Sequence, residues 1–325
     1  MRIEPAEGLS EGIDQVSPAG VRSPLYWALL FSIFPLGTAH AHGRIGKRFI
    51  PTLFEIEDPF VAEELTFLLG FFEEPAKGGE PAVDEFEVET EFAKRITPRF
   101  ALSAGGDFRS RDTHDGPTDS GFGNLDLGAK YQFLSLPKLE TVASFGVNVE
   151  IGKTGKKKVE ASRFSTISPA LFYGAGAGFL PDSFRFLRPI ALTGLVSAHF
   201  PSASRSAGEA NPISLSWGFA LHYSIPYLDA FVMDTGLPDF FNRFVPVLEV
   251  ALETCIDRPA DCEGGTSGTV NPGFVWLGSK FEVGFAARVP INDKTGDDVG
   301  VFGLVHLFID DMFPKSLGRP IWPRP

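Results

Sequence analysis

Four glutamates occupy alternate positions near residue 90, namely Glu85, Glu87, Glu89 and Glu91. In a strand, alternate side chains share one face, whereas a helix would spread them around its circumference. Such a column of carboxylates would bias a water-filled pore toward cations or bind a basic group, and its members would repel one another. The alternative is a hydrated wall whose carboxylates pair with arginines and lysines elsewhere in the chain.

Further charged residues fall on the same polar phase of other segments with this alternation. Carboxylates there extend the acidic character, and two cations are candidate partners for them. The candidate lumen-lining residues are therefore the four glutamates together with Asp126, Lys130, Glu150, Glu249, Glu253, Glu282 and Arg288.

Other chemistry finds little support in the residue pattern. Gly-x-Ser-x-Gly, HExxH and P-loop motifs are absent, and no spacing selects a Ser/His/Asp set, so we expect no enzyme and no cofactor. His199, His222 and His306 share no ligand spacing, and His42 could chelate a metal only as a new N-terminus without a second ligand, so we expect no metal site. Cys255 and Cys262 are predicted to form a short-loop disulfide.

Composition favours many strands punctuated by turns. The 325 residues include 35 Gly, 26 Pro and 32 Phe but only 3 Met. The net charge of −12 argues against nucleic acid as a partner, because phosphate binding requires a basic face.

An apolar stretch near the N-terminus predicts export. Residues 25–36 carry no charge and are followed by Ala39-His40-Ala41, a small-x-small cleavage pattern. Twelve residues are too few for a membrane span, which needs roughly 20. The segment 1–20 has four acidic residues against one Arg, which is a poor leader, so a start at Val16 or Val21 is an alternative. We expect cleavage after Ala41.

Period-two alternation recurs through most of the remaining chain and predicts twelve strands. The clearest alternation covers residues 85–92, 124–133, 141–151, 213–224 and 281–289. Weaker versions cover 62–72, 99–110, 164–178, 187–200, 243–254, 269–279 and 299–310.

The connections between these strands alternate in length. Long polar connections are expected at 111–121, 152–163, 201–211, 255–268 and 292–298, with short turns between them. This asymmetry is typical of outer-membrane barrels, which have short periplasmic turns and longer extracellular loops. The segment 225–242 is an exception, a long periplasmic connection with a short helix expected around Tyr227–Val232. Lys153, Lys156, Lys157 and Lys158 lie in one long loop and could meet lipopolysaccharide phosphates or simply solvent.

Alternation alone does not separate a membrane barrel from a soluble β-sandwich. Segments of about 10–13 residues suit a tilted crossing of the bilayer, the polar face is rich in small residues, and aromatics fall at strand ends. We therefore predict an all-β, antiparallel, up-and-down transmembrane barrel of about twelve strands. Its expected divisions are a signal peptide with extension (1–41), a periplasmic segment (42–61), the barrel (62–310) and a tail (311–325) in the lumen or at the periplasmic rim.

Several short motifs resemble one family of outer-membrane proteins. Gly121–Tyr131 is similar to the G-x-G-D-L-x-L-G-x-K-Y strand of the meta-pathway-of-phenol-degradation family, and Ser168–Leu171, Asn271–Phe274 and Arg288–Ile291 resemble its later strands. The segments at 42–65 and 310–314 resemble an uncharacterised branch of that family. Members often have Pro-Thr-Gly after the fourth strand, where this chain has Ile151–Gly155. The resemblance implies passage of small, often hydrophobic compounds across the outer membrane.

Three functions follow as expectations. The first is a channel or transporter in the outer membrane that passes a small solute through a polar and acid-biased lumen. The family resemblance implies that this solute is hydrophobic or aromatic. The second is a closed structural or interaction barrel, since twelve strands leave a narrow interior. The third is a soluble secreted β protein. Expected partners are outer-membrane lipid, lipopolysaccharide and the solute.

Overall fold

The computed structural model describes residues 43–76, 81–114, 116–206, 209–257 and 265–323. The chain divides into two compact units, Met1–Thr38 and Ala39–Pro325, and the first lies wholly outside the described residues. The expected signal peptide, its cleavage site after Ala41 and the candidate ligand His42 also lie outside them. The same is true of Cys262, one half of the expected disulfide.

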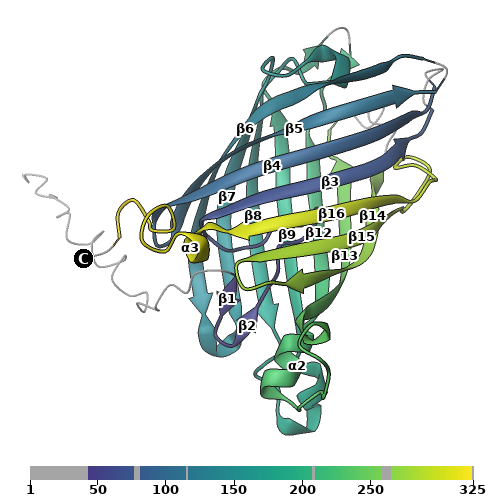
Figure 1. Ribbon diagram of the computed structural model, residues 1–325. Helices are drawn as coiled ribbons and strands as arrows, with labels where there is room; N and C mark the ends of the chain where they lie inside the picture. Colours follow the sequence, from purple (N-terminus) through teal and green to yellow (C-terminus); the bar gives the residue numbers. More distant parts are fainter. Residues whose placement is uncertain (1–42, 77–80, 115, 207–208, 258–264, 324–325) are drawn as a thin grey trace, which may run out of the picture. The chain divides into compact units, whose positions relative to one another are not determined.

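Twelve strands of the second unit form a closed antiparallel barrel, which confirms the predicted fold class and strand number (Figure 1). Each strand pairs with its neighbours in chain order, and the last strand closes the ring on the first. The barrel strands are β3 (Glu64–Glu74), β4 (Val83–Thr97), β5 (Phe100–Thr113), β6 (Thr118–Leu136), β7 (Thr141–Ile151), β8 (Thr166–Gly176), β9 (Ile190–Pro201), β12 (Ser214–Tyr223), β13 (Phe244–Cys255), β14 (Thr266–Leu277), β15 (Phe281–Pro290) and β16 (Gly300–Phe308).

The two faces of each strand have different environments. On β12, Trp217, Phe219 and Leu221 are exposed, whereas Ala220 and His222 on the alternate face are buried. The same division recurs around the barrel, so a belt of exposed leucine, valine and phenylalanine covers its outer surface. A soluble protein rarely leaves such an area in water, whereas a membrane barrel turns it toward lipid.

The expected long loop at 111–121 is mostly strand. β5 ends at Thr113 and β6 begins at Thr118, so only residues 114–117 connect them. Cross-strand pairing continues through Arg111–Asp119 and Asp112–Thr118, and the rings of Phe108 and Phe122 lie 5.4 Å apart just before this extension. The charged side chains that made this segment look like a loop pair with residues outside it: Arg111 lies 3.1 Å from Glu85 of β4, and Asp119 lies 2.9 Å from Lys158.

The connections carry short elements of their own. The helix expected around Tyr227–Val232 is present as α2 (Ile225–Phe231), with Ser224 as its N-cap. The others are β1 (Arg44–Ile45), β2 (Arg48–Phe49), η1 (Pro137–Leu139), η2 (Lys157–Val159), η3 (Asp182–Leu187), β10 (Arg205–Ser206), β11 (Glu209–Ala210), η4 (Phe241–Arg243) and α3 (Ile309–Met312). Within the described residues, none of the helices has the length and apolar character needed to cross a membrane.

The C-terminal tail follows α3 and lies at the rim of the barrel. The backbone N–H of Ile321 donates to the carbonyl of Arg95 at 3.2 Å, and that of Trp322 donates to Ile96 at 2.9 Å. Residues at the end of β4 therefore hold the tail by strand-like hydrogen bonds. Of the two positions considered for the tail, the rim is the one observed.

Candidate functional site

Residues 50–63, called here the inner segment, run through the interior of the barrel. Lys130 of β6 donates to the carbonyl of Asp58 at 2.9 Å, and Ser144 of β7 donates to the carbonyl of Pro59. Other residues of the same segment contact β13, β14 and β15, on a different part of the ring. Only a segment inside a closed barrel can reach all of these strands. The sequence suggested a periplasmic position for residues 42–61, and these contacts instead place residues 50–61 within the lumen.

Apolar side chains hold one side of the inner segment. Leu53, Phe54 and Ile56 pack in a buried cluster with inward-facing residues of β12, β13, β15 and β16, namely Ala220, Val245, Val247, Ala286, Phe302 and Leu304. The ring of Phe54 stacks on that of Phe302 at 6.1 Å. The inward face of this part of the barrel is therefore apolar, although the sequence pattern predicted a polar one. Val245, Val247, Phe302 and Leu304 alternate in the sequence and could have revealed it.

Two buried carboxylates bind the backbone of the inner segment. Glu249 accepts hydrogen bonds from the N–H groups of Glu55, at 2.9 Å, and Ile56. Glu282 accepts one from the N–H of Thr52 at 2.8 Å. Both glutamates were candidate lumen-lining residues. Both face inward, but they bind protein backbone there and are fully buried.

The β1–β2 hairpin before the inner segment is fixed to the short turns by one arginine. Arg48 is buried, forms an ion pair with Glu140 at 3.1 Å and donates to the carbonyl of Pro189 at 2.7 Å. Burial lowers the pKa of Arg48, and the charge of Glu140 partly offsets this effect. The tight turn requires Gly46, because its φ is +62° and a Cβ there would collide with the carbonyl oxygen of Pro137.

The acidic column on β4 is half neutralised. Arg109 of β5 lies 3.0 Å from Glu87 and 3.7 Å from Glu85, and Arg111 lies 3.1 Å from Glu85. Arg109 also contacts Asp107 at 2.7 Å on its own strand. These arginines alternate in the sequence with the period of β5. Arg111 fell in the expected loop at 111–121 and Arg109 near the end of the expected strand at 99–110, and neither was among the candidate lumen residues.

The other half of the column has no cation opposite it. Glu89 lies opposite Asp107, and Glu91 lies opposite Gly105. Both line a cavity of about 450 Å³ within the barrel. The same cavity is lined by Asp126, Glu150, Glu57 and Glu64, by Lys130, and by apolar residues that include Phe60 and Phe172. Lys130 forms an ion pair with Glu57 of the inner segment, so the cavity keeps an excess of carboxylates.

A larger cavity of about 860 Å³ lies between the strand ends of the long-loop side. Glu253 and Arg288, the remaining candidates, line it together with Glu55 of the inner segment. The guanidinium of Arg288 lies 4.2 Å from the centre of the Phe72 ring and not on a carboxylate of β4. The expected pairing of Arg288 with the acidic column is therefore replaced by stacking on an aromatic ring.

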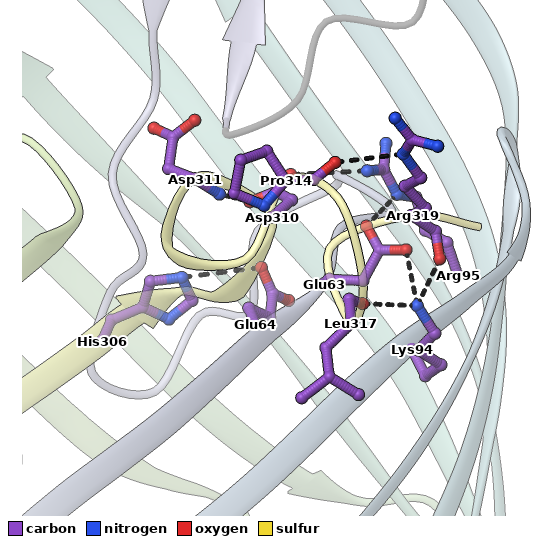
Figure 2. Close-up of polar contacts among 10 residues, drawn as sticks. All are labelled: Glu63, Glu64, Lys94, Arg95, His306, Asp310, Asp311, Pro314, Leu317 and Arg319. Carbon is purple, nitrogen blue, oxygen red and sulfur yellow. Dashed lines mark hydrogen bonds and ion pairs between the residues drawn. The ribbon is translucent and has the colours of Figure 1, made fainter.

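A cluster of charged residues connects the chain just before the first barrel strand with the chain just after the last one (Figure 2). Glu63, the last residue of the inner segment, contacts Lys94 at 3.1 Å and also Arg95 of β4. Arg95 reaches Asp310 of α3 at 3.4 Å, and Lys94 donates to the carbonyl of Leu317 in the tail at 2.6 Å. The inner segment, β4 and the C-terminal tail are thus fixed to one another.

The described residues also bring together possible metal ligands. Glu73, Asp84 and His114 have ligand atoms within 4.8 Å of one another at the long-loop end. Exposed acidic groups of this kind are common without a metal, so we assign none.

The lysine-rich loop that contains Lys153, Lys156, Lys157 and Lys158 has at least one contact within the protein, because Lys158 lies 2.9 Å from Asp119.

Comparison with known proteins identifies the fold. No family model matches the chain, and no curated protein does. Among solved structures, an outer membrane channel from Pseudomonas putida F1 is similar, with a TM-score of 0.55 and 11% identity over 79% of this chain and 99% of that one. The KdgM porin has a TM-score of 0.42 and 9% identity over 75% and 98%. At these identities the likeness concerns fold alone: the chain is a twelve-stranded barrel of the outer-membrane type.

Proposed function

We propose that the protein is an outer-membrane channel or transporter that passes a small solute through its lumen. The observation that carries this proposal is a pair of cavities, about 860 and 450 Å³, inside a closed barrel whose outer surface is apolar. Export of the chain by the N-terminal apolar stretch is part of the proposal. So is contact of the outer belt with membrane lipid.

The lining of the smaller cavity indicates the kind of solute. Glu89 and Glu91 have no cation opposite them in the wall, and Phe60 and Phe172 lie in the same cavity. A solute with an apolar body and a basic group would match both. The apolar part agrees with the family resemblance of the sequence, which implies small hydrophobic compounds.

Planar-bilayer recording of the refolded protein tests the proposal. We expect single-channel steps whose reversal potential in a salt gradient indicates a preference for cations, and we expect this preference to weaken in Glu89→Gln/Glu91→Gln. The matched control is Asp182→Asn, which removes a carboxylate from an exposed short turn. An equal shift of the reversal potential in both variants would exclude the proposed function. So would a folded barrel that gives no conductance steps and no uptake of solute into liposomes.

A second candidate is a closed barrel with a structural or binding role. The inner segment favours it, because residues 50–63 occupy the lumen and are held there by Glu249, Glu282 and an apolar cluster. If bilayer recordings show no conductance even after the contacts of the inner segment are weakened, this candidate is supported. The exposed apolar belt argues against the third expectation, a soluble secreted protein.

We propose no enzymatic activity. The strongest catalytic arrangement is His199, whose two ring nitrogens lie 2.8 Å from the hydroxyls of Ser168 and Ser216. Among the described residues no carboxylate makes a hydrogen bond with this histidine, so the set lacks the third group that orients a catalytic base. We assign it a structural role between β8, β9 and β12.

A further inference from the structure

A cavity of about 410 Å³ lies at the short-turn end of the barrel, apart from the acidic lumen. Five pieces of chain surround it: the β1–β2 hairpin, α2, η4, the β14–β15 turn and the end of β16 with α3. Figure 1 shows the hairpin and α2 at this same end. The lining residues that matter are Arg44, Lys47, Arg243, Asp311, Phe49, Tyr227, Phe231 and Phe308.

The charge of this cavity is opposite to that of the lumen. Three cations, Arg44, Lys47 and Arg243, line it against one carboxylate, Asp311. In the described part of the chain neither Arg44 nor Lys47 makes an ion pair, while Arg243 donates to the carbonyl of Leu277 at 3.3 Å. The cavity therefore has excess positive charge in a protein whose net charge is −12. An anion is the ligand that such a site favours.

The walls of the cavity are aromatic. Phe49 and Phe308 pack edge to face at 6.0 Å, and Tyr227 and Phe231 have ring centres 4.9 Å apart. The ammonium of Lys47 lies 5.0 Å from the centre of the Phe231 ring, which joins the charged part of the lining to the apolar part. A small inorganic anion would leave these rings unused.

We propose that this cavity binds an amphiphilic anion, in which a phosphate or carboxylate is joined to an apolar body. Arg44, Lys47 and Arg243 surround the head group, and the four rings contact the apolar body. The volume of about 410 Å³ is within the range of small-molecule sites. The same chemistry is present in an anionic phospholipid and in a soluble aryl phosphate, and the experiment separates these two sources.

The test uses the full chain in nanodiscs of phosphatidylcholine and two soluble probes, phenyl phosphate and dihexanoyl phosphatidylglycerol. Dihexanoyl phosphatidylcholine, which is zwitterionic and has no net charge, is the comparison. Binding is measured by isothermal titration. We expect an anionic probe to bind and its affinity to fall at least tenfold in Arg44→Gln/Lys47→Gln. Both side chains are exposed, so these substitutions should leave folding intact, which electrophoretic mobility of the unheated protein checks.

Lys138→Gln/Arg185→Gln is the matched control. It removes two exposed cations from η1 and η3, at the same end of the barrel but outside the cavity, and should bind as the parent does. Binding of the phosphatidylglycerol alone assigns the site to membrane lipid, and binding of phenyl phosphate assigns it to soluble anions. No binding of either probe, equal binding of the zwitterionic phospholipid, or an equal loss in the control overturns the proposal.

Discussion

The guanidinium of Arg95 forms an ion pair with the carboxylate of Glu63, a side chain that is completely buried where the inner segment becomes β3. The same guanidinium extends to Asp310, just after the strand that closes the barrel. One arginine in the second strand of the ring thus contacts the residues on either side of the closure between the first strand and the last. Figure 2 shows how these groups converge.

Replacing Arg95 with Met should lower the free energy of unfolding by about 3–5 kcal/mol, because two buried carboxylates lose the guanidinium between them, although Glu63 keeps its contact with Lys94. Urea unfolding of the detergent-folded protein, followed by tryptophan fluorescence, measures this change. Lys138→Met removes an exposed cation and should leave stability within about 0.5 kcal/mol. Adding Glu63→Gln to Arg95→Met should recover part of the loss. An undiminished loss in the double variant would show that the ion pair is not the cause.

The two halves of the acidic column should respond differently to loss of charge. Glu85→Gln removes a buried carboxylate that contacts both Arg109 and Arg111 and should cost about 2 kcal/mol of stability, even though each arginine keeps other carboxylates. Glu89→Gln should cost nothing or stabilise the barrel, because Glu89 faces another carboxylate, Asp107. The same urea titration compares them. Equal effects would mean that the ion pairs on β5 contribute little.

Weakening the contacts of the inner segment should open the channel. Glu249→Ala/Glu282→Ala removes three hydrogen bonds from backbone N–H groups to carboxylates. Since such bonds are worth more than about 1 kcal/mol each, we expect the open fraction in bilayer recordings to rise at least about tenfold. Glu253→Ala removes a lumen carboxylate that makes no bond with the inner segment in the described structure and is the control for charge. An unchanged open fraction in a folded double variant would separate the inner segment from conduction.

The loop after α2 should depend on pH through one carboxylate. The backbone N–H and hydroxyl of Thr235 both donate to Asp229, and these bonds lower the pKa of that side chain. A lowered folded-state pKa means that the stabilisation is present above the unfolded-state pKa and is lost as pH falls through the folded-state value. In Thr235→Val, an NMR titration of the Asp229 carboxyl should give a higher pKa than in the parent. An identical pKa in both proteins would contradict this assignment.

The strands could be predicted from sequence because each is specified by its own residues. Phe86, Val88 and Phe92 alternate with glutamates on β4, and lipid on one side of the wall and the lumen on the other require that alternation. The helix after Tyr223 could also be predicted from the sequence, since Ser224 caps it and Pro226 lies in its first turn.

The candidate site could be predicted only in part from the sequence. Sequence analysis placed Glu249 and Glu282 on the polar phase of their strands, but it could not show that their partners are the backbone N–H groups of Thr52, Glu55 and Ile56. Those contacts join residues about two hundred positions apart, and no local pattern encodes them. The arginines that neutralise half of the acidic column lie on the neighbouring strand, and the register between β4 and β5 decides which glutamates they contact.

The sequence by itself determined the alternation, the number of strands and the acidic character of the inward face of β4, because each depends on the side chains of one short segment at a time. Only the tertiary structure decided where residues 50–63 lie, which glutamates of β4 face an arginine of β5, and where the C-terminal tail rests. The physical reason is closure of the barrel. A closed ring has an interior, and what fills it depends on volume and charge contributed by all twelve strands together.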